Sequence, residues 1–347
     1  MMRHFMAHPP QGFEVAYSTG DAPVFSTRFD LLTTADAAWR ERVRSWPGFR
    51  HWQRLLQPRT CFVGSTVSEY AWLPRHAEPD RLANDLVAAH GRRYPFFIIK
   101  DLPQDSPLLS ADDNAWNDAF AAACERAGFV LLEGQALAWV PIDFADADAY
   151  LARLSRGARR NIRRKLRVRE ELEIERLPTG CAAFDDDAFL AEIHALYDSV
   201  YAQSELHFDY LDAGFFRAVL RDKSCAGVVF TYRHAGRLIG WNLCFEHAGM
   251  LVDKYIGLRY PDAHAYNLYA VSWMHNIEYA RRRGLRFYVA GWSDPEIKAH
   301  LGAHMTFTRH AVRPRNPLVR LALRHLAPHF ESDRQWFEER EHASDRA

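Results

Sequence analysis

The segment from Gly227 to Leu258, GVVFTYRHAGRLIGWNLCFEHAGMLVDKYIGL, constrains the fold more than any other part of the chain. It contains three runs rich in β-branched, aromatic and aliphatic residues, separated by His-Ala-Gly tripeptides at 234–236 and 247–249. Short glycine-containing turns between such runs are typical of hairpins, in which consecutive strands pair antiparallel. The segment therefore predicts a three-stranded antiparallel meander.

Helical patterns flank this meander on both sides. Amphipathic segments at 187–204 and 214–223 precede it, and a long helical pattern at 266–284 follows it. A short apolar strand at 287–292 and a helix at 294–302, with Pro295 at its first position, come next. The order helix, helix, three strands, helix, strand, helix predicts an α+β fold.

The first half of the chain gives weaker signals. PFFIIK at 95–100 is predicted as a buried strand and the segment 112–128 as a helix ending at a glycine. Two apolar runs, at 129–133 and 136–143, are predicted as separate strands with Gly134 and Gln135 between them. A chain of 347 residues is long enough for two domains. We place the divisions to give domains at 1–135 and 136–312, followed by an amphipathic helix and tail at 313–347.

Composition excludes several classes of protein. The hydrophobic content of 48% and the charged content of 25% are those of a globular protein rather than a disordered or fibrous one. The net charge is zero, which disfavours a general nucleic-acid coat protein. The five cysteines form no C-x-x-C pair, which suits the reducing cytoplasm, and no apolar run is long enough for a signal peptide or a membrane span. We therefore predict a cytoplasmic protein without a transmembrane segment.

Charge is distributed unevenly despite this balance. The first 150 residues carry 14 Lys and Arg against 19 Asp and Glu, and the remainder carry 30 against 25. Eight basic side chains, seven of them arginine, lie between Arg156 and Arg169 on a predicted helix from Leu151 to Glu171. Guanidinium groups bind phosphate oxygens in pairs, so the patch is a candidate phosphate site. The alternative is a solvated helix face, partly neutralised by the acidic residues that follow.

The order of these elements and several of their motifs resemble the acyl-CoA N-acyltransferase (GNAT) superfamily, in the FemAB-like tandem arrangement of two such domains. The resemblance rests on LARLSRGARRNIRRKLR, GRLIGWNLCF, LVDKYIGL, AYNLYAVSWMHNIEYARRRGLRFYVAG and PEIKAHLGA. It covers residues 136–312, and residues 1–135 correspond by analogy to a degenerate first GNAT-like domain. It implies a tandem GNAT fold with mixed, mostly antiparallel sheets flanked by helices.

The resemblance also implies a reaction, the transfer of an acyl or aminoacyl group to an amine. The chain lacks the Q/R-x-x-G-x-G/A loop that holds the pyrophosphate of acetyl-CoA in ordinary GNAT enzymes, and GLRYPDAHAYNLY stands in its place. The co-substrate is therefore left open between acyl-CoA and aminoacyl-tRNA, and we expect no tightly bound cofactor. The alternative function is a non-catalytic nucleotide- or RNA-binding protein that keeps the fold.

Three residues are the candidate catalytic groups. Asp253 and Tyr255 lie on the third strand of the meander, where alternation predicts that they share one face and that Lys254 takes the other. A carboxylate and a phenol can exchange protons with an attacking amine and a leaving group. The resemblance makes Lys298 a contact to phosphate or to the transition state. The alternatives are a structural ion pair between Asp253 and Lys254, and a surface position for Lys298.

A second set is predicted to bind substrate. It consists of Arg159, Arg160, Arg163, Lys254, Tyr266, Tyr269, Glu205 and His207. The two tyrosines lie at a helix start where substrate would dock, or are core aromatics at i, i+3. Glu205 and His207 form an acid and imidazole pair in a predicted loop, although a single histidine is more often a packed one.

Two further possibilities have weaker support. His300 and His304 have the i, i+4 spacing of a zinc helix, but Gly302 separates them and the glutamate of H-E-x-x-H is missing, so we predict no metal site. The amphipathic segment at 314–330 could rest on an anionic membrane surface. Docking on its own domain is the simpler prediction, because the apolar face lacks tryptophan.

Overall fold

The computed structural model describes residues 1–33, 37–204, 208–327, 334 and 337. Contacts between Cα atoms divide the chain into two compact units. Unit 1 contains Met1, Arg3–Gln11 and Leu137–Met305, and unit 2 contains Met2, Gly12–Ala136 and Thr306–Ala347. The divisions predicted from the sequence fell at 135/136 and 312/313. Each unit is an α+β structure with its own hydrophobic core.

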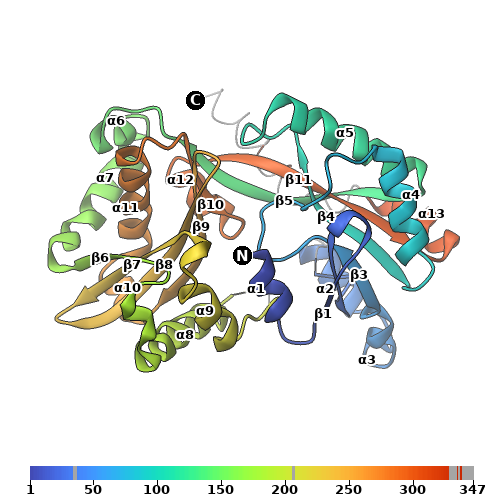
Figure 1. The fold of residues 1–347 in the computed structure, drawn as a ribbon, viewed down its shortest axis with the longest axis horizontal. Coiled ribbons are helices and arrows are strands. Elements are labelled where there is room, and N and C mark those ends of the chain that lie inside the picture. Colours follow the sequence, from blue (N-terminus) through green and yellow to red (C-terminus); the bar gives the residue numbers. More distant parts are fainter. Residues whose placement is uncertain (34–36, 205–207, 328–333, 335–336, 338–347) are drawn as a thin grey trace. The chain divides into compact units, whose positions relative to one another are not determined.

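Unit 1 is built around a mixed sheet (Figure 1). Its strands, in sheet order, are β5 (Val130–Pro141, which enters unit 1 at Leu137), β10 (Phe287–Gly291), β9 (Met250–Leu258), β8 (Arg237–His247), β7 (Gly227–His234) and β6 (Glu173–Pro178). β9 and β10 are parallel, and the other neighbours are antiparallel. The predicted meander is confirmed as β7, β8 and β9.

Helices cover both faces of this sheet (Figure 1). They are α1 (Met2–Ala7), α6 (Ala147–Ala152), α7 (Arg156–Leu166), α8 (Asp187–Tyr201), α9 (Ala213–Leu220), α10 (Asp262–Ala265), α11 (Leu268–Arg282) and α12 (Pro295–His300). The neighbours Trp241 and Asn242 show the two faces. Trp241 donates a hydrogen bond to the Ile193 carbonyl of α8, whereas Asn242 bonds with Asn276 of α11.

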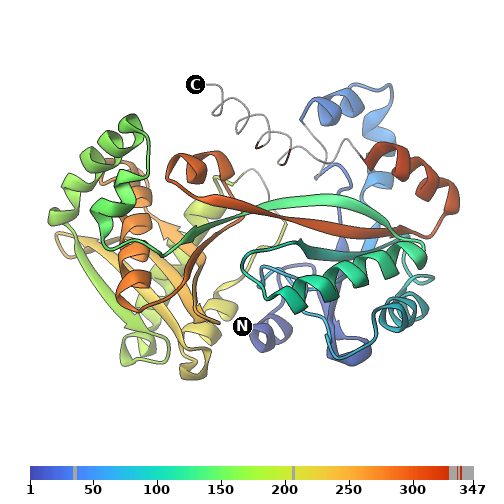
Figure 2. The same cartoon turned by 90° about the horizontal axis from the view of Figure 1, so that it is seen from above.

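The predicted helix from Leu151 to Glu171 is wrong in one respect, because the chain breaks it near Ser155. α6 ends at Ala152, and Ser155 then caps α7 by accepting a hydrogen bond from the backbone N–H of Ala158. A serine at this position satisfies an N–H group that has no partner within the helix, so it begins a new helix. α6 and α7 lie beside α11 (Figure 2), and Ile162 of α7 is buried.

Unit 2 also contains strands with mixed pairing. Its strands, in sheet order, are β1 (Glu14–Tyr17), β2 (Pro23–Arg28), β3 (Arg59–Val63), β4 (Phe96–Gln104) and β11 (His304–Pro314). Its helices are α2 (Ala37–Arg44), α3 (Phe49–Trp52), α4 (Pro79–His90), α5 (Ala111–Arg126) and α13 (Pro317–Leu326). β3 and β4 are parallel, and their neighbours pair antiparallel.

The structure refines two predictions from the sequence, one for residues 129–143 and one for the C-terminal helix. The runs at 129–133 and 136–143 form one strand, β5, rather than two. Gly134 does not break the strand; a side chain there would come within 2.3 Å of the Thr308 hydroxyl, so glycine permits a close approach of backbones. α13 begins at Pro317, and its apolar residues Leu318, Val319 and Leu321 are exposed. Membrane contact by residues 314–330 stays a prediction.

The parallel strands of unit 2 part just beyond their last pair, Val63 and Ile99. At that point the Lys100 ammonium donates a hydrogen bond to the Ser65 carbonyl, with an N–O distance of 2.9 Å, and pairs with the Asp101 carboxylate. Lys100 therefore connects the segment that follows β3 to the end of β4, at the point where the two strands separate.

The close contact between the paired strands β8 and β9 leads to a testable prediction. A Cβ on Gly257 would lie 2.2 Å from Nε1 of the fully buried Trp241, whose hydrogen bond to Ile193 leaves it little freedom to move. Gly257→Ala should therefore destabilise the protein by about 1–3 kcal/mol in chemical denaturation. Gly157→Ala on α7, where a Cβ meets open space, is the control and should not destabilise. Equal stability of the two variants would contradict this account.

Candidate active site

Strands β9 and β10 separate at the centre of the unit 1 sheet. They pair in parallel up to Val252 and Val289. Each strand then carries a β-bulge, at Lys254 in β9 relative to β8 and at Ala290 in β10 relative to β5. Bulges bend a strand and redirect its side chains, and they often lie next to active sites. The carboxyl ends of two parallel strands that diverge are a common place for a ligand.

The bulge at Lys254 overturns the prediction that Asp253 and Tyr255 share a face. Tyr255 is opposite Leu243, and Asp253 is opposite the next residue, Cys244, so one extra residue lies between them. Tyr255 consequently packs its ring against the aromatic side chains of α8 and α9, which include Phe215 and Phe216. Asp253 lies on the opposite face, toward α11. Simple alternation fails wherever a bulge adds a residue.

Asp253 accepts hydrogen bonds from side chains of three different elements. Tyr288 of β10 and Asn276 of α11 each donate to Oδ2 at 2.9 Å, and Asn242 of β8 donates to Oδ1 at 3.4 Å. Asp253 as a whole residue is partly buried. Burial raises its pKa, whereas the bonds from Tyr288 and Asn242 and the attraction of Lys298 oppose that rise.

A second layer of hydrogen bonds fixes these donors. Asn242 donates to Oδ1 of Asn276 at 3.1 Å and accepts a bond from the Tyr232 hydroxyl at 2.9 Å. Asn242, Asn276 and Tyr232 are fully or almost fully buried, and a buried polar network of this kind is rigid when its members are satisfied. The network therefore holds the Asp253 carboxylate in one orientation.

Lys298 lies on α12 with only 4% of its surface exposed. Within the described ranges its ammonium has no hydrogen bond or ion pair, and the carboxylates of Asp253 and Asp294 attract it. Burial lowers the pKa of Lys298 from 10.5 to about 8, and the two carboxylates oppose this shift. A Cβ on Gly291 of β10 would lie 3.9 Å from Nζ, so the ammonium reaches the place where β9 and β10 part.

Tyr269 is the third group at this point. Its hydroxyl is buried and, among the residues whose placement is described, has no hydrogen-bond partner. Burial raises its pKa, and the negative charges of Asp294 and Asp253 add to the effect. A buried hydroxyl without a partner carries a free-energy cost that a ligand could relieve. The charge of Asp253 thus acts on both Lys298 and Tyr269, and the sequence had selected all three residues.

Other predicted residues lie elsewhere in unit 1. Tyr266 packs against His234, with the rings tilted, their centroids 4.4 Å apart and the tyrosine hydroxyl 3.1 Å from either ring nitrogen. Lys254 is the bulge residue of β9 and is partly exposed. Glu205 and His207 lie outside the described residues. His300 and His304 have separate contacts, to the Glu296 carbonyl and to the Trp139 ring.

The arginines of α7 form a separate surface. Arg163 is exposed and bonds to Asp148 at 2.7 Å. The guanidinium groups of Arg159 and Arg160 have no hydrogen bond or ion pair in the part of the chain that the structure describes, and Arg160 is exposed. Further along, Arg169 is fixed by two bonds of 2.8 Å to Glu278 of α11. The patch thus offers guanidinium groups to a ligand, but its described contacts do not reach Asp253 or Lys298.

Sequence reasoning missed the residues that orient Asp253. Asn242 stands within an apolar strand, and Asn276 stands on the buried side of α11. Asparagine is unfavourable in strand and helix interiors, so its presence at a core position was the available signal. Tyr288 gave no such signal, because a tyrosine in a strand is ordinary.

Comparisons with known proteins agree with this architecture. The model of a family described as peptidoglycan biosynthesis/recognition, FemAB-like, matches residues 81–342. L-PGS from Bacillus licheniformis has a similar fold, with a TM-score of 0.53 at 10% identity over 94% of this chain and 95% of that chain. FemX is also similar, with a TM-score of 0.52 at 11% identity over 92% and 96% of the two chains. A search of curated proteins finds no match.

The fold is therefore α+β, as the sequence predicted, and it is similar to those of L-PGS and FemX. The family whose model matches makes the class of the protein that of the transferases. More particularly, the chain belongs to the FemAB-like family. Among the helices that the structure describes, none combines the length and apolar character needed to cross a membrane.

The burial of Lys298 leads to a prediction about how the stability of the protein depends on pH. Between pH 8 and 10.5 the unfolded chain binds more protons at this lysine than the folded chain, so wild-type stability should rise with pH across that window. Lys298→Met should lack this rise and should be more stable than wild type near pH 7, by roughly 3 kcal/mol at most.

Urea unfolding at pH 7, 8, 9 and 10 measures both effects, with the exposed Lys223→Met as the matched control. A Lys298→Met variant that is less stable than wild type at pH 7 would show that the ammonium has a structural function. The combination of higher stability and lower activity is typical of a residue kept for function.

Proposed function

We propose that this protein is an N-acyltransferase that moves an acyl or aminoacyl group from a phosphate-bearing donor to an amine. One observation carries the proposal: a buried ammonium that is not bonded to any described residue is attracted by a rigidly held carboxylate where two strands diverge. A cation in a site of low dielectric interacts strongly with negative charge that develops on a substrate. Family membership supports the same reaction class.

The three groups have complementary chemistry in such a transfer. The acceptor nitrogen attacks the acyl carbonyl, a C–N bond forms, and the C–S or C–O bond to the donor breaks. Asp253 accepts the proton that the amine loses, because it is the carboxylate at this point. The Lys298 ammonium stabilises the negative oxygen of the intermediate, or a donor phosphate. The Tyr269 hydroxyl, predicted from the sequence only to bind substrate, donates a hydrogen bond to the leaving group in place of Tyr255. The leaving group takes up the proton that Asp253 accepted.

The donor is either acyl-CoA or aminoacyl-tRNA, and both carry phosphates that suit Arg159, Arg160 and Arg163. No tightly bound cofactor is needed for this reaction, since the donor brings the activated group. A cytoplasmic location, where both donors occur, is part of the same proposal. The rival function, binding of nucleotide or RNA without catalysis, would not require Asp253 and Lys298 to lie together.

Substitution of the three groups tests the chemistry. Lys298→Met should lower kcat and kcat/KM together, on the order of 100-fold, because a contact made only in the transition state is lost. Asp253→Asn and Tyr269→Phe should also reduce turnover. The assay offers acyl-CoA and aminoacyl-tRNA donors to a panel of amines and detects the new amide by mass spectrometry.

Tyr255→Phe, Tyr17→Phe and Lys223→Met are the matched controls, since each removes the same functional group as Tyr269→Phe or Lys298→Met at a position outside the cluster. If the three site variants keep wild-type rates with a substrate pair that wild type converts, the proposed catalytic roles are wrong. Loss of activity in all six variants would point to damaged folding, which circular dichroism detects.

The arginine surface of α7 is tested by binding. Replacing Arg159, Arg160 and Arg163 together by Ala should weaken donor binding and flatten its salt dependence, because each lost phosphate contact removes released counterions. Titrations with tRNA and with acyl-CoA at several salt concentrations measure both quantities. A variant with Arg42, Arg44 and Arg50 replaced by Ala, exposed residues of unit 2, controls for net charge. Unchanged affinity for both donors would make the surface a solvated helix face.

A further inference from the structure

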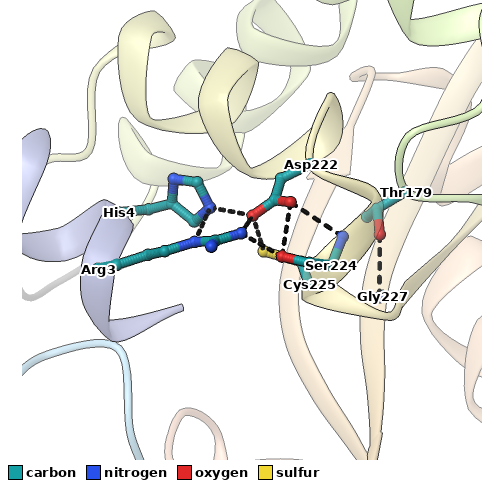
Figure 3. A network of polar contacts seen from close by, with 7 residues as sticks. All are labelled: Arg3, His4, Thr179, Asp222, Ser224, Cys225 and Gly227. Atoms are coloured by element: carbon teal, nitrogen blue, oxygen red, sulfur yellow. Dashed lines mark hydrogen bonds and ion pairs between the residues drawn. The ribbon is translucent and has the colours of Figure 1, made fainter.

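Three side chains of unit 1 that can bind metal ions meet outside the candidate active site (Figure 3). They are His4 of α1 and, just after α9, Asp222 and Cys225. Their ligand atoms all lie within 4.8 Å of one another. His4 Nε2 is 2.7 Å from Asp222 Oδ2, and the Cys225 thiol is 3.2 Å from the same oxygen.

The backbone around these residues is already ordered. The Asp222 side chain accepts a hydrogen bond of 2.9 Å from the backbone N–H of Ser224 and one of 2.8 Å from its hydroxyl. Ala226 then takes a left-handed conformation, with φ of 51°, and Gly227 N–H bonds to the Thr179 hydroxyl at 3.0 Å. Two residues separate Asp222 from Cys225, which is the spacing of ligand pairs in many zinc loops.

A cationic group already lies against this cluster. The Arg3 guanidinium contacts the Asp222 carboxylate and the Ser224 hydroxyl (Figure 3). Its side chain is 61% exposed, whereas the side chains of His4 and Asp222 are only 12% and 16% exposed. The arginine can therefore move into solvent without unpacking the protein, while the three ligating side chains stay in place.

We propose that His4, Asp222 and Cys225 form a Zn²⁺ site, with water as the fourth ligand. Imidazole, thiolate and carboxylate are the three zinc ligands of proteins, and a thiolate favours Zn²⁺ over Mg²⁺ and Ca²⁺. On binding, Cys225 releases its thiol proton to solvent, Nε2 of neutral His4 donates its lone pair, and Arg3 leaves Asp222. One proton is released and one bond forms from each ligand atom to the metal.

Zinc at this point would fasten the N-terminal helix to the loop between α9 and β7. α1 is six residues long, too short to be stable without tertiary contacts. A metal bond from His4 to Asp222 and Cys225 replaces an exposed ion pair by coordination. The site is thus a structural clamp within unit 1, independent of the transfer reaction.

Cobalt is the probe, because Co²⁺ bound to a thiolate absorbs in the near ultraviolet by charge transfer from sulfur. Reduced full-length protein should bind one Co²⁺ with this band, and Zn²⁺ should displace it and raise the midpoint of thermal unfolding. Cys225→Ser should lose the band. Its affinity for Co²⁺ should fall by more than the roughly 10- to 100-fold that is typical when only an outer-shell partner of a metal ligand is lost. Cys181→Ser, another partly exposed thiol, is the matched control.

Two further variants separate the clamp from a simple ion-pair contact. His4→Ala should weaken Co²⁺ binding, whereas Arg3→Ala should keep the band and bind Co²⁺ at least as tightly, because the competing cation is gone. Circular dichroism checks the fold of each variant. The proposal is overturned if wild type shows no thiolate band, if the band persists in Cys225→Ser, or if folded Arg3→Ala no longer binds Co²⁺.

Discussion

The arrangement of unit 1 depends on how one carboxylate is held at the centre of its sheet. Burying a charged group is costly unless hydrogen bonds satisfy it, and Asp253 receives them from Asn242, Asn276 and Tyr288. These donors come from β8, α11 and β10, so the bonds fix the helix and both strands relative to the carboxylate. In that arrangement the ammonium of Lys298 is attracted by the carboxylate of Asp253 as well as by that of Asp294.

Much of the fold in the second half was predictable because its local signals agree. The meander from Gly227 to Leu258 has strand-forming runs and glycine turns at the right intervals, and Gly284 ends α11 as its sequence indicates. The first half was less predictable. Gly134 looked like a break, but it serves the close approach of Thr308, a contact more than 170 residues away along the chain. No local pattern contains such a contact.

The candidate site could be predicted by residue type but not by geometry. Asp253, Lys298 and Tyr269 were recognisable from their positions in motifs. Their convergence depends on two β-bulges, at Lys254 and Ala290. Neither lysine nor alanine has a conformational preference from which a bulge could be predicted. A shift of one residue moved Tyr255 to the apolar face, which is why the sequence assigned a catalytic role to a tyrosine that packs among aromatic rings.

Lys100, which connects the separated strands of unit 2, makes the two units differ in their ability to bind an anion. Both units place a lysine where parallel strands diverge, but the Lys100 ammonium is bonded to the Ser65 carbonyl and paired with Asp101, whereas that of Lys298 is not bonded within the described residues. A cation whose bonds are made within the protein has little affinity left for an incoming anion. Two units of one chain can therefore differ in the positive charge that they offer to an anion, and the bonding of a single side chain is enough to make that difference.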